Sequence, residues 1–314
     1  MSLPLPPSSR RRRTRRGLAA VAAGAGIALA GSLGLHSADA TPSARQAVQE
    51  DTLRQAATTP GALRVFGLTP NGRLLRFEVG TPRQLTNYGI ISGLEGDTRL
   101  VGIDFRVQDD GLYGVGNQGG VYKIARFTAV ATKVSQLEVP LNGTHFGVDF
   151  NPAADRLRIV SDTGQNLRHD VNNVAVPVTT VDGPLTYPPL PEVATGITAA
   201  AYTNNDLDAD TSTTLFDVDT NLHQVAIQSP ANSGQLAATG KTGVELRQAV
   251  GFDIYSFLDD TGATQRVSAL ATAKVMTGGR NLYRVNLVTG EFTSLGVFPT
   301  RTRVVDIALP LDQR

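Results

Sequence analysis

Four aspartates recur in one short sequence pattern, and their carboxylates are the first candidates for chemistry in this chain. The pattern places an apolar residue on each side of the aspartate, usually with a glycine in front, and it occurs at residues 102–105, 147–150, 251–254 and 304–307. The aspartates are Asp104, Asp149, Asp253 and Asp306. At equivalent positions of a repeating fold they could surround a central channel and bind a cation or a polar ligand.

The same aspartates have a structural interpretation. A repeated carboxylate on a buried strand accepts hydrogen bonds from backbone or hydroxyl donors, and such partners are required because a buried, unpaired charge is costly. In that role the carboxylates hold neighbouring repeats together. We favour the structural role and keep all four aspartates as candidate ligand-binding residues.

A second group of polar side chains lies at residues 161–168, which read SDTGQNLR. Asp162, Gln165, Asn166 and Arg168 could face a ligand from one side of a hairpin. Turn chemistry also accounts for most of these residues, because Asp, Asn and Gly favour chain reversal for backbone reasons. We keep the four as candidate ligand-binding residues.

Signatures of known catalytic chemistry are absent from the sequence. The chain has no cysteine, which excludes disulfides, thiolate metal sites and a cysteine nucleophile. It contains no Gly-x-Ser-x-Gly elbow, phosphate-binding loop or His-Glu-x-x-His motif. Residues 206–210 (DLDAD) have alternating aspartates like the start of a calcium loop, but the glycine at position six and the glutamate at position twelve are missing. His145, His169 and His223 lie far apart in the sequence, so their spacing does not suggest a shared metal. We therefore predict no particular metal site, assign no cofactor and favour a protein that is not an enzyme.

Short strands are the elements that would position these side chains. Residues 147–172 contain three strand signals separated by turn sequences rich in Asn, Asp, Pro and Gly, which predicts an antiparallel meander. From Leu63 onward, turn residues punctuate the chain about every 8–12 residues, a spacing typical of all-β domains.

The repeat decides among the all-β architectures. With a looser copy at residues 196–199, the aspartate pattern begins at residues 102, 147, 196, 251 and 304, at intervals of 45, 49, 55 and 53 residues. A second pattern, typical of the third strand of each repeat, recurs with a similar spacing at residues 74–77, 121–124, 167–170, 222–225 and 282–285. This period is typical of a four-stranded blade, so the sequence predicts a five-bladed β-propeller.

The two ends of the predicted domain complement each other. The first blade has strand signals from residue 64 onward but no aspartate pattern in front of them, whereas the last pattern, at residues 304–309, has no blade after it. If the C-terminal strand supplies the innermost strand of blade one, both gaps are filled and the ring has no open sheet edge at its junction. We predict a single propeller domain over residues 61–314, closed by this strand.

These features resemble a bacterial family of exported proteins, the domain of unknown function DUF4394, which is placed among the β-propellers. The resemblance rests on residues 147–152, 157–168, 181–183 and 199–204 and extends from residue 63 to about residue 309. It implies a propeller fold and an exported location. The family brings no catalytic residues that could be carried over to this chain.

The N-terminus independently predicts export. Six arginines within residues 10–16 precede an uncharged stretch rich in Ala, Gly and Leu, and residues 38–40 (ADA) fit a cleavage site. Arg15 and Arg16, directly before that stretch, favour a twin-arginine signal over the general secretory route. We predict a signal peptide at residues 1–40, no stable membrane span after its removal, and a disordered or short helical lead-in at residues 41–60.

The charge balance excludes nucleic acid as a partner. The chain has 29 basic and 28 acidic residues, but six arginines and one aspartate belong to residues 1–40, which leaves 23 basic against 27 acidic residues. A basic surface of the kind that binds phosphate backbones is therefore not expected.

We expect a secreted, periplasmic or cell-surface monomer that acts as a binding or scaffold module for an unknown small molecule, glycan or protein. The alternative is a hydrolase or lyase that uses the channel carboxylates with a metal ion. Because fold alone does not decide function, the discriminating feature is whether polar groups converge at one mouth of the channel.

Overall fold

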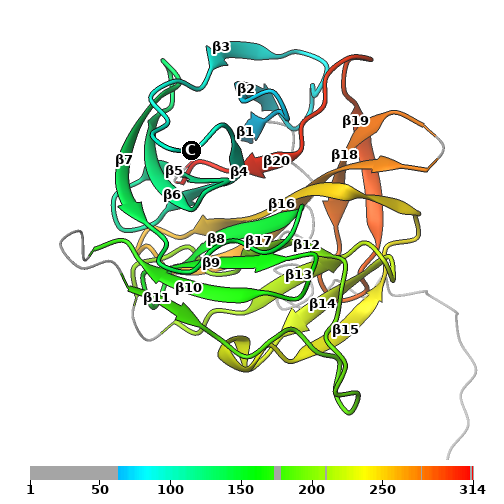
Figure 1. Ribbon diagram of the computed structural model, residues 1–314. Helices are drawn as coiled ribbons and strands as arrows, with labels where there is room; N and C mark the ends of the chain where they lie inside the picture. Colours follow the sequence, from blue (N-terminus) through cyan, green and yellow to red (C-terminus); the bar gives the residue numbers. More distant parts are fainter. Residues whose placement is uncertain (1–62, 173–177, 209–210, 277, 312, 314) are drawn as a thin grey trace, which may run out of the picture. The chain divides into compact units, whose positions relative to one another are not determined.

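The computed structural model describes residues 63–172, 178–208, 211–276, 278–311 and 313. The signal peptide and the lead-in predicted for residues 1–60 lie outside this part of the chain. The described residues form five antiparallel sheets of four strands each, arranged as the blades of a β-propeller (Figure 1). No helix within them is long and apolar enough to cross a membrane.

Four blades follow the chain in order from the innermost strand outward. Blade 2 contains β4 (Leu100–Arg106), β5 (Gly111–Gly116), β6 (Gly120–Ala125) and β7 (Val130–Gln136). Blade 3 contains β8 (Phe146–Asn151), β9 (Arg156–Ser161), β10 (Asn166–Asp170) and β11 (Val178–Val181). Blade 4 contains β12 (Ile197–Tyr202), β13 (Leu215–Asp219), β14 (Gln224–Gln228) and β15 (Leu236–Lys241), with a short 3-10 helix at Ala231–Ser233.

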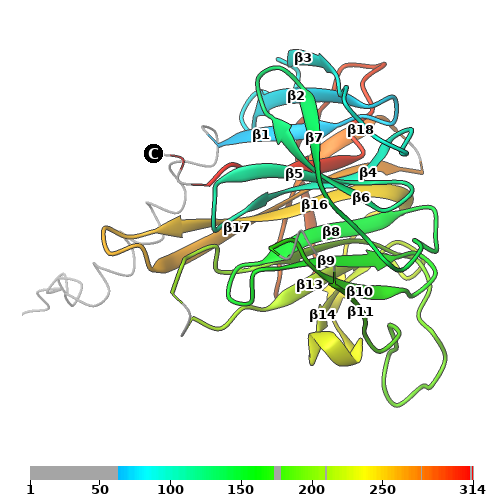
Figure 2. The same cartoon turned by 60° about the vertical axis from the view of Figure 1, so that its left-hand side comes forward.

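Blade 5 contains the longest hairpin of the described residues. Its strands are β16 (Leu246–Leu258), β17 (Thr264–Val275), β18 (Arg280–Val285) and β19 (Phe292–Val297). The tip of the β16–β17 hairpin extends beyond the neighbouring strands in Figure 2.

Blade 1 combines the two ends of the described chain. Its strands are β20 (Asp306–Ala308), β1 (Arg64–Leu68), β2 (Arg73–Glu78) and β3 (Thr86–Ile90), and β20 is the innermost. Ala308 pairs with Phe66 and Asp306 pairs with Leu68 in an antiparallel register. The predicted closure of the propeller by the C-terminal strand, and with it the count of five blades, is confirmed.

The core consists of five apolar clusters, one between each pair of neighbouring blades. Phe66 of blade 1 meets Phe105 of blade 2 edge to face at 5.7 Å, and Tyr113 of blade 2 meets Phe150 of blade 3 in the same way at 5.2 Å. Both faces of a blade are thus covered, so an inner strand such as β12 is buried at every residue. Strands buried on both faces read as near-continuous apolar runs, which is the pattern that the sequence shows at residues 197–202, where Thr198 is the exception.

Candidate functional site

Three of the recurring aspartates connect one blade to the next. Each carboxylate accepts a hydrogen bond from a backbone amide of the inner strand of the following blade, and each side chain is buried. The pairs are Phe150 N to Asp104 (2.7 Å), Tyr202 N to Asp149 (3.0 Å) and Leu309 N to Asp253 (2.5 Å). The structural role favoured by the sequence pattern is therefore present, because these bonds satisfy amides at the blade interfaces.

These bonds also define which inner-strand residues are equivalent. We call the residue of each inner strand that is equivalent to Asp104, Asp149 or Asp253 the aspartate position. In blade 3 the donor, Phe150, comes directly after Asp149. By the same rule the donors Tyr202 and Leu309 put the aspartate position at Ala201 in blade 4 and at Ala308 in blade 1. The predicted copy at residues 196–199 is therefore three residues too early. The hydrogen bond from Tyr202 N and the strand pairing, rather than similarity to the pattern, fix the register.

Asp306 is likewise not equivalent to the other three aspartates, contrary to the sequence prediction. It lies two residues before Ala308 and accepts a hydrogen bond from Ile103 N at 2.7 Å. Residues two apart on a strand face the same way, so Asp306 still connects blade 1 to blade 2, one step along the strand from the others.

The glycine of the repeated pattern has a steric cause. Gly102, Gly147 and Gly251 lie two residues before the aspartate position, where neighbouring inner strands approach closely. A Cβ on Gly147 would lie 2.4 Å from Ala200 N, and one on Gly251 would lie 2.5 Å from the Asp306 Cα. Glycine is therefore required where the adjacent backbone occupies this space.

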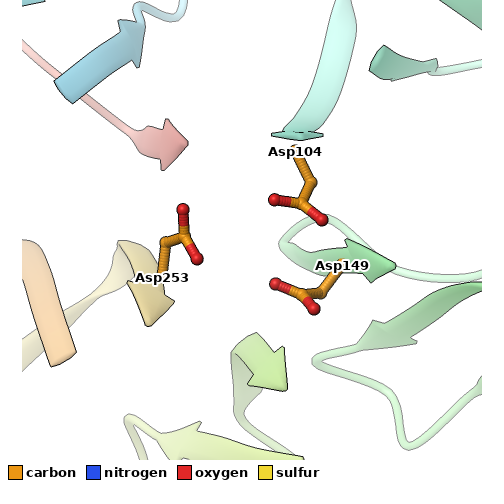
Figure 3. A group of neighbouring side chains, drawn as sticks. All are labelled: Asp104, Asp149 and Asp253. Atoms are coloured by element: carbon orange, nitrogen blue, oxygen red, sulfur yellow. The ribbon is translucent and has the colours of Figure 1, made fainter. Parts of the chain in front are cut away.

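The carboxylates of Asp104, Asp149 and Asp253 converge on one another from blades 2, 3 and 5 (Figure 3). One oxygen from each lies within 4.8 Å of the others. Burial, reinforced by the neighbouring carboxylates, raises the pKa of Asp104 and Asp149 well above the ordinary value, and burial raises the pKa of Asp253 to about 7. Such a cluster holds protons at neutral pH or gives oxygen ligands to a cation.

Substitution of Asp149 separates the two roles of the aspartates. We expect Asp149→Asn to lower stability less than Asp149→Ala, because the amide oxygen retains the bond from Tyr202 N. Alanine leaves this buried amide unpaired, at a cost of about 1–3 kcal/mol. Urea denaturation measures the difference. If Asp149→Ala keeps the parent stability but abolishes binding of a cation, the structural role is wrong.

A cavity of about 270 Å³ opens where the inner strands begin. Every blade contributes to its wall the residue three places before the aspartate position. These residues are Val101, Phe146, Thr198, Val250 and Val305. Because all five inner strands contribute, the cavity lies at one mouth of the central channel, and we call it the channel mouth.

Basic side chains surround the channel mouth. Arg99, His145 and Arg303 line it, and no carboxylate residue does. Neither arginine forms an ion pair with any residue that the structure describes. The His145 Nδ1 lies 3.3 Å from Asp162 Oδ2. Two unpaired guanidinium groups at a concave surface produce a positive potential that favours an anion.

Two buried polar groups lie at or behind the same wall. Thr198 lines the cavity with 1% of its surface exposed, and its Oγ1 has no hydrogen-bond partner within the described residues. Arg280 donates from Nη1 to the carbonyl of Ala249, another lining residue, at 2.9 Å. Burial and the charge of Arg303 lower the pKa of Arg280 to about 10. A nearby negative charge would therefore be favourable.

The polar hairpin predicted from the sequence directs most of its hydrogen bonds into the protein. Asp162 accepts from Thr144 N at 2.8 Å and so holds the segment that carries His145. Gln165 donates to the Pro140 carbonyl. Asn166 is buried and accepts from Arg158 Nη1 at 2.7 Å, and Arg168 forms an ion pair with Asp182 at 2.7 Å. Ligand binding by these four residues stays a prediction.

Sequence reasoning did not find the channel mouth. One signal was available, because Arg99 and Arg303 both lie five residues before the aspartate position of their blades, and His145 lies four before it. Recognising that signal requires the correct register of blade 1, in which Ala308 and not Asp306 is the reference.

The fold and the site define a class of protein. It is a five-bladed β-propeller with a basic cavity at one mouth of its channel and a cluster of carboxylates between its inner strands. The chain belongs to the family described as "Domain of unknown function (DUF4394)", whose match covers residues 73–308. The resemblance seen in the sequence is confirmed.

Comparison with solved structures gives only distant likenesses. No curated protein matches the chain. A solved protein of unknown function from Bacteroides thetaiotaomicron VPI-5482 is 13% identical, with 81% of this chain and 62% of that chain covered and a TM-score of 0.41. An auxiliary nutrient binding protein from Bacteroides ovatus ATCC 8483 is 13% identical, with 66% and 55% covered and a TM-score of 0.36. This chain spans less than two thirds of the length of either.

Proposed function

We propose that this propeller is a binding module that holds a small organic anion at the channel mouth. The observation that carries the proposal is the convergence of Arg99, His145 and Arg303 over a cavity to which all five blades contribute. Arginine is well suited to carboxylate because its planar fork makes two parallel charge-assisted hydrogen bonds. The aspartates of the inner strands then serve to fix the strands that position these side chains.

The wall of the channel mouth favours a particular kind of anion. Four of the five residues three places before the aspartate position are apolar, namely Val101, Phe146, Val250 and Val305. The fifth, Thr198, offers one hydroxyl. Pockets of this type bury an apolar body and orient it with a few polar groups. The ligand is therefore a monocarboxylate with a small apolar body, in preference to an inorganic anion.

Calorimetric titration with acetate, butyrate and benzoate, and with phosphate and sulfate, tests the proposal. We expect butyrate or benzoate to bind more tightly than phosphate or sulfate. The Arg99→Gln, Arg303→Gln double variant should weaken that binding at least about tenfold, since a hydrogen bond to a charged group contributes about 1.5–3 kcal/mol. Arg284→Gln, an exposed arginine on β18, is the matched control. Absence of binding by every carboxylate, or equal binding by the double variant, contradicts the proposal.

A second candidate function, a hydrolase or lyase that uses a metal ion, is favoured by the converging carboxylates of Asp104, Asp149 and Asp253. These residues would supply oxygen ligands of the kind that divalent cations take in proteins. Elemental analysis of protein from its native host tests this candidate. A stoichiometric metal that is lost in Asp104→Asn supports it, whereas metal-free protein from the native host contradicts it.

The same cluster predicts how stability depends on pH. Unfolded aspartates release their protons near pH 3.9, whereas the buried ones retain them to higher pH, Asp253 to about 7. The folded state therefore binds more protons across this window, and its stability falls as pH rises from about 4 to about 7. We expect metal-free parent protein to lose more stability than Asp104→Asn between about pH 5 and pH 8, by more than about 1 kcal/mol.

Urea denaturation at the two pH values measures this difference. Titrating groups outside the cluster are common to both proteins and cancel in the comparison. A divalent cation that binds the cluster competes with the protons, so its stabilising effect should be larger at the higher pH. Equal pH dependence of the two proteins would show that the cluster does not hold its protons in the folded state.

We also propose export by the twin-arginine route, which rests on Arg15 and Arg16. Replacement of both by lysine should leave precursor in the cytoplasm, as measured by fractionation and immunoblotting of the host. Undiminished export of the Arg15→Lys, Arg16→Lys variant would assign the signal to the general secretory route.

A further inference from the structure

A second cavity adjoins the channel mouth beside blade 1, and we call it the blade 1 groove. Its volume is about 500 Å³. Residues of β2 and β3 line it, together with the segment that joins β19 to β20. Pro70 and Arg303 line both cavities. Because these two residues are shared, a ligand held at the channel mouth can extend into the groove.

All the charged side chains that line the groove are arginines. They are Arg73, Arg301 and Arg303, and no carboxylate residue lines it. None of the three forms an ion pair with any residue that the structure describes. With Arg99 and His145 of the channel mouth, they form one basic surface that extends over both cavities. A single carboxylate at the channel mouth would leave most of this positive charge without a partner.

Asn87 adds a neutral donor to the same wall. Its Oδ1 accepts a hydrogen bond from Gly89 N at 3.0 Å. A backbone amide can only donate, so this bond fixes the orientation of the Asn87 side chain and leaves its Nδ2 as a donor. The groove thus presents guanidinium and amide donors. A carboxylate, which only accepts hydrogen bonds when it is ionised, matches such a wall.

The groove also has an apolar part. Pro70, Leu75 and Leu85 line it, and Leu75 pairs with Asn87 across β2 and β3. An apolar chain that covers these side chains is removed from water together with them, which is favourable. An inorganic anion makes no use of this surface. The groove therefore favours an anion that carries an apolar chain.

The segment that joins β19 to β20, which carries two of the arginines, is anchored in the protein. Phe298 and Val304 belong to this segment and are 4% and 0% exposed. The Thr272 hydroxyl donates to the Val304 carbonyl at 3.1 Å. A segment that is already ordered loses less conformational freedom when a ligand binds, so its cations are suited to recognition.

From these contacts we infer that the channel mouth and the blade 1 groove together bind a dicarboxylate whose carboxylates are joined by an apolar chain. The inference rests on the proposed function, because the first carboxylate occupies the channel mouth. The chain passes Pro70, and the second carboxylate accepts hydrogen bonds from Arg73 and Arg301. The second contact then forms within the complex, which strengthens binding relative to either contact alone. Monocarboxylates, which occupy the channel mouth only, are the weaker ligands.

Calorimetric titration of each dicarboxylate against the monocarboxylate of the same chain length tests the inference. The pairs are succinate with butyrate, adipate with hexanoate, and suberate with octanoate. We expect at least one dicarboxylate to bind at least about tenfold more tightly than its monocarboxylate, as for added hydrogen bonds between charged groups. The Arg73→Gln, Arg301→Gln double variant should lose this advantage and bind butyrate as the parent does.

Arg76→Gln is the matched control. Arg76 belongs to the same strand as Arg73 and lines neither cavity, so its variant should keep the preference for the dicarboxylate. If no carboxylate binds the parent, the proposed function fails and the inference fails with it. If butyrate binds but no dicarboxylate exceeds its monocarboxylate, the inference alone is overturned. An unchanged preference in the Arg73→Gln, Arg301→Gln variant overturns it as well.

Discussion

Deletion of residues 303–314 yields an aggregating or protease-sensitive product, because it removes the strand that closes the propeller. In the intact chain β20 pairs with β1, and Val305 N donates to the Leu68 carbonyl at 2.8 Å. Asp306 connects the same strand to β4 through Ile103 N. The deletion therefore leaves backbone groups of β1 in blade 1 and of β4 in blade 2 without partners, which is costly when they are buried.

The deletion also removes part of the core. Val304, Ile307 and Leu309 are at most 1% exposed and belong to the cluster between blades 5 and 1. Loss of three large buried side chains costs several kcal/mol, since each one contributes about 1.5–3 kcal/mol, which is a large part of a typical domain stability.

Gel filtration, limited proteolysis and thermal denaturation measure this outcome. The control is deletion of residues 41–58, which carry no strand signal in the sequence and should leave the melting temperature of the exported form nearly unchanged. A soluble protein that lacks residues 303–314 and still melts cooperatively would refute the structural role of the closure.

Gly147→Ala lowers the free energy of unfolding by at least about 3 kcal/mol, or the melting temperature by about 6–12 °C, although it adds a single methyl group. That methyl group would lie 2.4 Å from Ala200 N and 2.7 Å from the Ala199 carbonyl carbon. Both are backbone atoms of the neighbouring inner strand and cannot rotate away. The two blades must move apart instead, which disturbs the bond from Tyr202 N to Asp149.

Gly279→Ala is the matched control, because a Cβ on Gly279 meets no atom within 4 Å and its backbone is not left-handed. We expect it to be neutral or slightly stabilising. Thermal and urea denaturation of both variants measure the contrast. Equal stability of the two variants would mean that the inner strands are not held at the observed separation.

The period of the sequence was enough to establish the number of blades. Each blade spends about 50 residues on four strands and their turns, so a spacing of 45–55 residues between copies of one pattern leaves few other architectures. The closure followed from two incomplete ends, because an inner strand without a blade and a blade without an inner strand satisfy each other.

The register of the strands within a blade was harder to predict from the sequence. In blade 4 the pattern was placed at residues 196–199, whereas the hydrogen bond from Tyr202 N puts the aspartate position at Ala201. In blade 1 the register predicted from Asp306 was wrong, since Asp306 is two residues from the equivalent position at Ala308. A carboxylate reaches amides on either side of its own position, so its presence in a strand does not fix the register.

The sequence by itself determined the all-β repeat, its closure and the residues that hold the inner strands, because these depend on periodic spacing and local backbone chemistry. Only the tertiary structure decided which side chains meet. Arg99, His145 and Arg303 come from three blades. Arg99 and Arg303 occupy equivalent positions of their blades, but this equivalence can be seen only when the register of blade 1 is known, and strand pairing fixes that register. The candidate sites therefore became visible only after the ring was closed.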